Sequence, residues 1–191
     1  MPLLTASVSA CRNWGVWWSS SAHTETYACP VFNAWSTTTR MNVRVRFLGR
    51  RDWKVPRSVL KEMEISEELT RHNTGMTLTI AFNYGGRVEV VDAVKRLIAD
   101  HDAGRLKGEK LTPESISRRL YHADMPDPDL IIRTSGEERI SNFLLWQAAY
   151  SELYFTPVYW PDFDREQLYE AIRDYQKRSR RFGAIAENDA G

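Results

Sequence analysis

The sequence predicts an α/β fold in which a mostly parallel β-sheet is flanked by helices. Short apolar segments with strand periodicity alternate with longer segments of helical periodicity, which is the pattern of βαβ units. The chain has 191 residues, of which 42% are hydrophobic and 27% are charged. These ordinary values exclude a wholly disordered chain and supply enough apolar side chains for a core.

Residues 1–40 differ in composition from the rest of the chain. They contain only three charged residues, four of the seven tryptophans and both cysteines, Cys11 and Cys29. Neither helical nor strand periodicity persists in this segment. We interpret residues 1–40 as an atypical, irregular leader, with a native but unusual extension as the alternative. Residues 41–191 form the predicted domain.

The first half of that domain contains two predicted strands and two predicted helices. Residues 42–49 alternate between apolar and basic side chains, which predicts a half-buried strand. A helix over residues 55–72 ends at Asn-Thr-Gly, and residues 76–82 form a second strand. After an Asn-Tyr-Gly-Gly turn, a second helix is predicted with an apolar face made by Val88, Val91, Val94 and Leu97 or Ile98.

The second half begins with a short helix, for which Thr112 is the predicted N-cap and Pro113 the first residue. A rigid Pro-Asp-Pro segment then leads into a short apolar strand at residues 130–132. A helix is expected over residues 141–150 and a strand over residues 153–160.

The last predicted helix starts at a capping box formed by Asp164 and Gln167. Basic residues gather near its end, where they face the negative end of the helix dipole. The residues expected to be buried on this helix are Leu168, Ala171, Ile172 and Tyr175.

Several function classes are disfavoured by composition. The chain has 26 basic and 25 acidic residues, so no global positive field attracts nucleic acid. No apolar run is long enough to span a membrane and no secretory signal is visible. Two cysteines are too few for a disulfide framework, so a reducing, cytoplasmic location is expected. The four histidines show no metal-ligand spacing, and the common nucleotide and hydrolase motifs are absent.

The residues that follow each strand are candidate ligand-binding residues, because parallel sheets bind ligands beyond the carboxyl ends of their strands. An apolar strand runs into Arg133, and a small-residue loop then carries Arg139 and Ser141 to the start of the expected helix. Arginine forks and a helix N-terminus both favour phosphate oxygens, which predicts a phosphate or diphosphate site. The alternative is that both arginines pair with Glu137 and Glu138, and that Ser141 is only an N-cap.

Three further sequence features point less specifically to a binding site. Residues 83–87 carry paired glycines, which permit the backbone to approach a ligand closely, but a tight turn is the simpler interpretation. Glu152 could hold a hard cation such as magnesium, but its spacing alone favours a solvated acid at a helix end. The basic residues 177–181 are typical of a solvated helix terminus, with a phosphate or acidic-lipid contact as the alternative.

These motifs resemble the cis-prenyltransferase family, which includes undecaprenyl diphosphate synthase (isoprenyl transferase). The resemblance covers roughly residues 41–185. It is carried by Asn-Tyr-Gly-Gly-Arg at residues 83–87, Pro-Asp-Pro-Asp-Leu-Ile-Ile-Arg-Thr-Ser-Gly-Glu at 126–137 and Arg-Ile-Ser-Asn-Phe-Leu-Leu-Trp-Gln at 139–147. It continues through residues 152–155, 160–163 and 180–183.

The resemblance implies a transferase that condenses isopentenyl diphosphate with an allylic prenyl diphosphate, such as farnesyl diphosphate, to make cis double bonds. It implies a Mg²⁺ cofactor, an apolar tunnel for the product and a homodimer. By motif position, Arg133, Arg139, Ile140 and Ser141 would bind the isopentenyl diphosphate, and Glu152 would help to bind the metal. Arg181 and Gly183 match a C-terminal motif that reaches the substrate across the dimer interface.

Two family motifs are missing, and one of them is a Phe-Ser-x-Glu-Asn-Trp stretch. No Asp-Gly-Asn-x-Arg-Trp loop is present in the sequence, so the resemblance identifies no catalytic residue. We therefore expect a partial domain with a replaced or missing N-terminal strand, inactive or nearly so on its own. The alternative is a non-catalytic partner subunit, or an inactive truncated paralogue, that binds isopentenyl diphosphate only. The expected partners are a second copy or a full-length homologue, and a peripheral membrane contact through the lipid product stays open.

Overall fold

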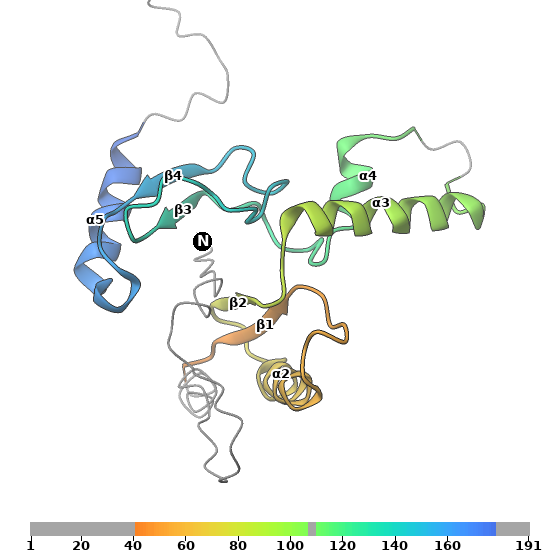
Figure 1. Cartoon of the computed structure of the whole chain (residues 1–191), viewed down its shortest axis with the longest axis horizontal. Coiled ribbons are helices and arrows are strands. Elements are labelled where there is room, and N and C mark those ends of the chain that lie inside the picture. Colours follow the sequence, from red (N-terminus) through yellow and green to blue (C-terminus); the bar gives the residue numbers. More distant parts are fainter. Residues whose placement is uncertain (1–40, 107–109, 179–191) are drawn as a thin grey trace, which may run out of the picture. The chain divides into compact units, whose positions relative to one another are not determined.

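The computed structural model describes residues 41–106 and 110–178, which fall into two compact units divided after Pro126 (Figure 1). Among these described residues, each unit contains one two-stranded parallel sheet. The predicted α/β class is therefore confirmed, whereas the domain boundary at residue 41 stays a prediction. The expectations for residues 1–40, Arg181 and Gly183 lie outside the described residues.

The first unit is built on strands β1 (Arg44–Leu48) and β2 (Thr77–Ala81), joined by helix α2 (Arg57–Thr70). The strands pair in parallel with Val45 opposite Leu78 and Phe47 opposite Ile80. Alternation places the apolar residues of β1 on one face, and α2 packs against the same strand. These elements match the predicted ones with slightly narrower bounds. The resulting core cluster consists of Val45, Phe47, Met63 and Ile80.

Side chains cover the edge of β1 that does not pair with β2. The backbone N–H of Val45 donates to Thr70 Oγ1, and that of Phe47 donates to Glu67 Oε1, each at a distance of 2.9 Å. The carbonyl of Phe47 accepts from His122 Nε2 at 2.9 Å. These bonds satisfy backbone groups that an edge strand otherwise leaves open to another chain.

Helix α3 (Gly86–Asp102) follows the turn at the end of β2, and α4 (Pro113–Ser117) packs against it. The predicted start of α4 is confirmed, because Pro113 is its first residue and the N–H of Thr112 donates to Ser115 Oγ at 3.2 Å.

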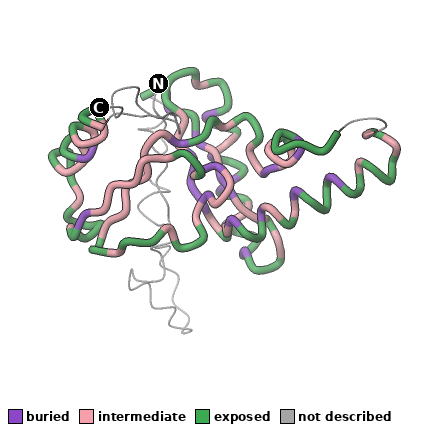
Figure 2. Tube along the Cα trace, turned by 90° about the horizontal axis from the view of Figure 1, so that it is seen from above, coloured by how far each residue is buried: buried purple, intermediate pink, exposed green. Residues whose placement is uncertain are grey.

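The apolar face predicted for α3 is only partly buried. Leu97 is buried, but the three valines and Ile98 are 37–55% exposed. The buried face is instead centred on Ala93, Leu97 and the carboxylate of Glu89, which accepts bonds from the Tyr84 hydroxyl (2.6 Å) and the Tyr121 N–H (3.0 Å). The buried face of this helix therefore includes a carboxylate whose hydrogen bonds are satisfied, while most of its apolar face stays exposed. Figure 2 shows exposed positions recurring along the length of this helix.

The second unit pairs β3 (Leu130–Arg133) with β4 (Glu152–Phe155) in parallel, with Leu130 opposite Glu152. The 3₁₀ turn η3 (Trp160–Asp162) leads to α5 (Arg165–Lys177). The predicted capping box is confirmed, since Asp164 Oδ1 accepts from the backbone N–H groups of Glu166 and Gln167. Of the four residues expected to be buried on α5, Ala171 is fully buried and the other three are half-buried.

Two expectations in this unit are wrong. Residues 141–150 form turns instead of a helix, because Ser141, Asn142 and Leu144 have φ values of 48°, 65° and 45°. Left-handed backbone at three positions interrupts a right-handed helix, and full burial of the Leu144 side chain accompanies that conformation. The strand predicted over residues 153–160 ends early, at Phe155.

None of the helices within residues 41–106 and 110–178 is both long and apolar enough to cross a membrane.

Candidate anion-binding site

The loop that follows β3 is held in place by its backbone. The carbonyl of Arg133 accepts from the N–H of Thr156 at 2.9 Å. Beyond the end of the strand, the N–H of Ser135 donates to Val158 O (2.8 Å) and that of Gly136 to Thr156 O (2.9 Å). Ser135 and Gly136 both have left-handed backbone, with φ values of 71° and 67°. The loop therefore turns sharply while its backbone stays attached to the segment after β4.

Two arginines converge on one carboxylate in this loop. Arg133 Nη2 lies 2.7 Å from Glu137 Oε2, and Arg139 Nη2 contacts the same oxygen. The side chain of Arg133 is 29% exposed, that of Arg139 is 66% exposed and that of Glu137 is 34% exposed. The bond from Arg133 is the main reason that the pKa of Glu137 is lowered, so this carboxyl is ionised at neutral pH.

The pairing that we considered as an alternative is thus present, but only through Glu137. Glu138 is exposed and takes part in neither of these ion pairs. Both guanidinium groups remain partly open to solvent, which leaves them able to exchange a carboxylate for a phosphate.

Ile140 and Ser141 continue directly from Arg139, but not as predicted. Ile140 O accepts from the N–H of Phe143 at 2.9 Å in a turn, and Ser141 is exposed with a left-handed backbone. No helix begins at Ser141, so neither the helix N-terminus expected for an anion nor the N-cap role is present. The hydroxyl of Ser141 remains a donor at the surface, two residues from a guanidinium group.

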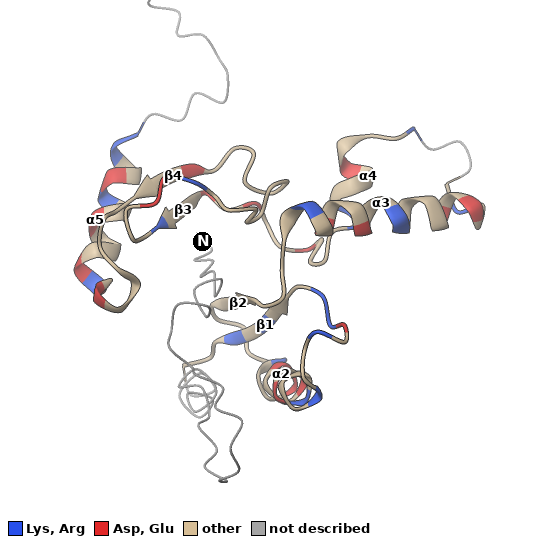
Figure 3. Ribbon diagram, in the orientation of Figure 1, with Lys and Arg blue, Asp and Glu red and all other residues tan. Residues whose placement is uncertain are grey.

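Glu152 is the first residue of β4, which corrects its assignment to a solvated helix end. Its Oε2 lies 2.8 Å from Arg178 Nη1, and Arg178 also contacts Asp174 (2.6 Å) and the carbonyl of Leu153 (3.0 Å). Figure 3 shows acidic and basic residues interspersed along α5, on which Asp174 lies. Arg178 therefore links the end of α5 to the start of β4.

A complete protein metal centre is not present in the part of the chain that the structure describes, where no group of three or more His, Cys, Asp or Glu side chains could hold an ion. Mg²⁺ is commonly held by one or two carboxylates together with substrate phosphates. Glu152, which is 30% exposed, fits that role as a single ligand once Arg178 moves aside.

Arg178 is a residue that sequence reasoning missed, because it was grouped with the basic helix end. Its spacing of four residues from Asp174 was a usable signal for a helical ion pair. The contact with Glu152 joins residues 26 positions apart, and no pattern in the sequence predicts it.

In the first unit, the turn after β2 has a structural role. Asn83 has a φ of 50°, and its Nδ2 donates to Arg50 O at 2.9 Å, which joins the ends of β1 and β2. The approach is close, because a Cβ on Gly49 would lie 2.0 Å from Phe82 O. The simpler interpretation of residues 83–87, a tight turn, is therefore consistent with the structure.

A polar cluster lies beside that turn. Arg50 donates to both carboxylate oxygens of Asp92, at 2.7 and 2.5 Å, and the Tyr121 hydroxyl donates to Asp92 Oδ2 at 2.5 Å. Arg50 is the main cause of the low pKa of Asp92, about 2, whereas burial raises the pKa of Tyr121 to about 12. These groups are therefore fixed as an ion pair and a neutral phenol near pH 7.

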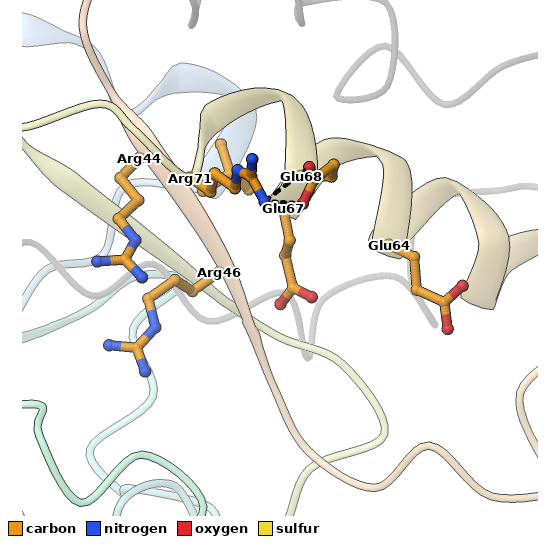
Figure 4. Close-up of a pocket in the computed structure, with 7 residues that line it drawn as sticks. Arg44, Arg46, Glu64, Glu67, Glu68 and Arg71 are labelled. Carbon is orange, nitrogen blue, oxygen red and sulfur yellow. Dashed lines mark hydrogen bonds and ion pairs between the residues drawn. The ribbon is translucent and has the colours of Figure 1, made fainter.

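A hollow of about 320 Å³ lies between β1 and α2 (Figure 4). Its basic and acidic side chains are largely committed to each other or to neighbours: Arg71 pairs with Glu68 at 3.1 Å, and Arg46 with Asp124 at 2.7 Å. We therefore place the candidate site at the β3 loop. The residues that line the hollow are Arg44, Val45, Arg46, Glu64, Glu67, Glu68 and Arg71.

Residues 26–183 match a family model described as "Putative undecaprenyl diphosphate synthase". This match starts upstream of the boundary that we placed at residue 41. The isoprenyl transferase of Agrobacterium fabrum is 55% identical over 151 residues, which are 79% of this chain and 61% of that protein. The trans,polycis-polyprenyl diphosphate synthase of Thermobifida fusca, named as (2Z,6E)-farnesyl diphosphate specific, is 50% identical over 78% of this chain and 52% of its own length.

Two solved structures are also similar. Lavandulyl diphosphate synthase from Lavandula x intermedia, in complex with dimethylallyl diphosphate, has a TM-score of 0.72 and 29% identity over 80% of this chain and 70% of that one. A probable undecaprenyl diphosphate synthase from Campylobacter jejuni has a TM-score of 0.70 and 30% identity over 81% and 70%. The chain spans roughly half to three-fifths of the length of the curated relatives that it matches.

Proposed function

Because the chain belongs to the undecaprenyl diphosphate synthase family of prenyltransferases, we propose that it acts in the condensation of isopentenyl diphosphate with an allylic prenyl diphosphate. The observation that carries this proposal is the convergence of Arg133 and Arg139 at the carboxyl end of β3. The names of two relatives support the substrate class, since one concerns farnesyl diphosphate and the other dimethylallyl diphosphate.

The arginine pair is proposed to bind the diphosphate of isopentenyl diphosphate. Planar guanidinium groups present forked donors that match phosphate oxygens, and the position of Arg133 at a strand end limits its movement. The exposed hydroxyl of Ser141 and the backbone of Ile140 lie next along the chain and would complete the cradle. These residues bind and orient isopentenyl diphosphate, whose alkene forms a bond to the allylic carbon as that carbon loses its diphosphate. The condensed product then loses a proton, which restores a double bond.

Glu152 is proposed as a carboxylate that helps to hold Mg²⁺ beside the diphosphate groups of the substrates. The bound ion would neutralise charge on the diphosphate of the allylic substrate as that group leaves. Arg178 must release Glu152 for that contact, since it now occupies the Oε2 atom.

Titration calorimetry of the full chain with isopentenyl diphosphate tests the proposed binding site. Loss of a charge-assisted hydrogen bond to a phosphate costs about 1.5–3 kcal/mol, so Arg139→Ala should weaken binding roughly 10- to 100-fold. Arg173→Ala removes an exposed arginine from α5 of the same unit and should leave affinity unchanged. Equal affinity of the two variants would contradict the proposal.

A turnover assay with farnesyl diphosphate, labelled isopentenyl diphosphate and Mg²⁺ tests the proposed chemistry. We expect slow turnover by the chain alone, because no residue matches the family's catalytic aspartate loop. Any label that enters the lipid fraction should disappear in Arg139→Ala. Fast turnover that survives this substitution would place the substrate elsewhere.

A further inference from the structure

Both ion pairs of the β3 loop end on the same atom, Glu137 Oε2. Two donors that contact one oxygen lie within about twice a hydrogen-bond length of each other, roughly 6 Å. Like charges at that separation repel unless an anion lies between them. The position of Glu137 Oε2 is therefore the point at which the loop is built to hold one negatively charged oxygen.

We propose that Glu137 is a specificity-determining residue, whose carboxylate takes the place of a phosphate oxygen until a ligand with more than one negative charge displaces it. This inference rests on the proposed diphosphate site. A singly charged ligand gains nothing by exchange, because it replaces one monoanion with another. A diphosphate gains, because it brings more charge and more oxygens to the same two arginines.

The loop allows this exchange without moving its backbone. Ser135 and Gly136 are held by hydrogen bonds to Val158 and Thr156, which lie outside the ion-pair cluster. The Glu137 side chain is 34% exposed, so rotation about its side-chain bonds releases it into solvent. Arg133 remains attached at the end of β3, and the exposed Arg139 side chain follows the incoming anion.

The neighbouring residue supplies a matched control. Glu138 has the same charge and lies one position along the chain, but it takes part in neither ion pair. Glu137→Gln and Glu138→Gln therefore change the net charge equally, and only the first removes the competing oxyanion. The difference in affinity between the two variants therefore measures the competition of the Glu137 carboxylate for the arginines, separately from the change in net charge.

The test is titration calorimetry of both variants and the parent chain with inorganic pyrophosphate, and with dimethyl phosphate as a singly charged probe, at low salt. Two partly exposed ion pairs are removed, so Glu137→Gln should bind pyrophosphate about three- to tenfold more tightly than Glu138→Gln. It should also gain proportionally more affinity for dimethyl phosphate, which lowers its selectivity.

Equal affinities of the two glutamine variants, or weaker pyrophosphate binding by Glu137→Gln in a protein that still unfolds cooperatively, would overturn the inference. Failure of the site itself has a different signature. In that case the parent chain and Arg139→Ala would bind pyrophosphate equally, whatever Glu137 does.

Discussion

In the first unit, Asp92 joins Arg50 and Tyr121 in one cluster of hydrogen bonds. Asp92 accepts from Arg50 and Tyr121 and is 18% exposed, so its charge is compensated close to the surface. Its pKa is depressed from 3.8 to about 2 in the folded chain. A depressed carboxyl pKa stabilises the fold above pH 3.8, and this contribution is lost as the pH falls towards 2.

We predict that Asp92→Asn lowers the free energy of unfolding by about 1–2 kcal/mol at pH 7. The loss should shrink progressively below pH 4, because the parent chain then loses the same interaction. Urea unfolding at several pH values measures this. Asp102→Asn, at the exposed end of α3, is the control, and a similar loss in both variants would refute the assignment.

His122 is a second residue with a defined protonation state. Its Nε2 donates to Phe47 O (2.9 Å), so its Nδ1 is the atom that accepts from Arg46 Nη2 (2.6 Å). Burial is the main reason that the pKa of His122 is lowered, and the neighbouring Arg46 acts in the same direction. The hydrogen bond to the Phe47 carbonyl opposes this shift, as do the charges of Asp124 and Glu67. The folded chain therefore favours the neutral form of the His122 imidazole.

A histidine with a depressed pKa stabilises the fold above pH 6.5, and the stability falls as the pH drops below that value. We predict that the melting temperature of the chain declines between pH 6.5 and 5 and that His122→Gln flattens this decline. Scanning calorimetry over that interval gives the result. If the melting temperature of the variant falls with pH as steeply as that of the parent chain, other titrating groups cause the decline.

At the scale of elements, α2 both packs on β1 and satisfies its open edge. Thr70 is fully buried, accepts from Val45 N–H and donates to Ser66 O (2.9 Å). Thr70→Val should therefore cost about 1–3 kcal/mol of stability, since it leaves the buried Val45 N–H without an acceptor. Ser58→Ala, on the exposed side of α2, should cost less than about 0.5 kcal/mol in the same urea unfolding series. Equal costs would show that the edge contact contributes nothing.

The elements also show which signals the sequence contains. The capping box of α5 depends on Asp164 and Gln167, three positions apart, and could be predicted from local chemistry alone. The turns over residues 141–150 could not, because a run of apolar residues with good helix propensity gave no sign of left-handed backbone at Leu144. The ion pair of Arg133 with Glu137 joins residues four positions apart, so it can be predicted from the sequence. The ion pair of Arg178 with Glu152 depends on tertiary structure.

At the scale of the whole molecule, each unit carries part of a family architecture. The candidate diphosphate residues that the structure describes, and Glu152, all belong to the second unit, whereas the first contributes a turn and polar clusters with structural roles. We propose that two copies associate, as the family resemblance implies, and that Arg181 acts at the partner's substrate. Sedimentation velocity should then show a particle of twice the chain mass.

Arg181→Ala should keep that mass and lower the turnover rate. Its affinity for isopentenyl diphosphate should change only weakly. A monomer at micromolar concentration would contradict the dimer proposal and leave Arg181 without a substrate to reach.

The central claim is that Arg133 and Arg139 receive the diphosphate of isopentenyl diphosphate, and side-chain NMR tests it most directly. The Nε–Hε signals of the arginines, assigned by single substitutions, would be followed as isopentenyl diphosphate is added to the full chain. We predict that the signals of Arg133 and Arg139 shift together and saturate, while that of Arg173 stays in place. Saturable shifts confined to other arginines would contradict the account.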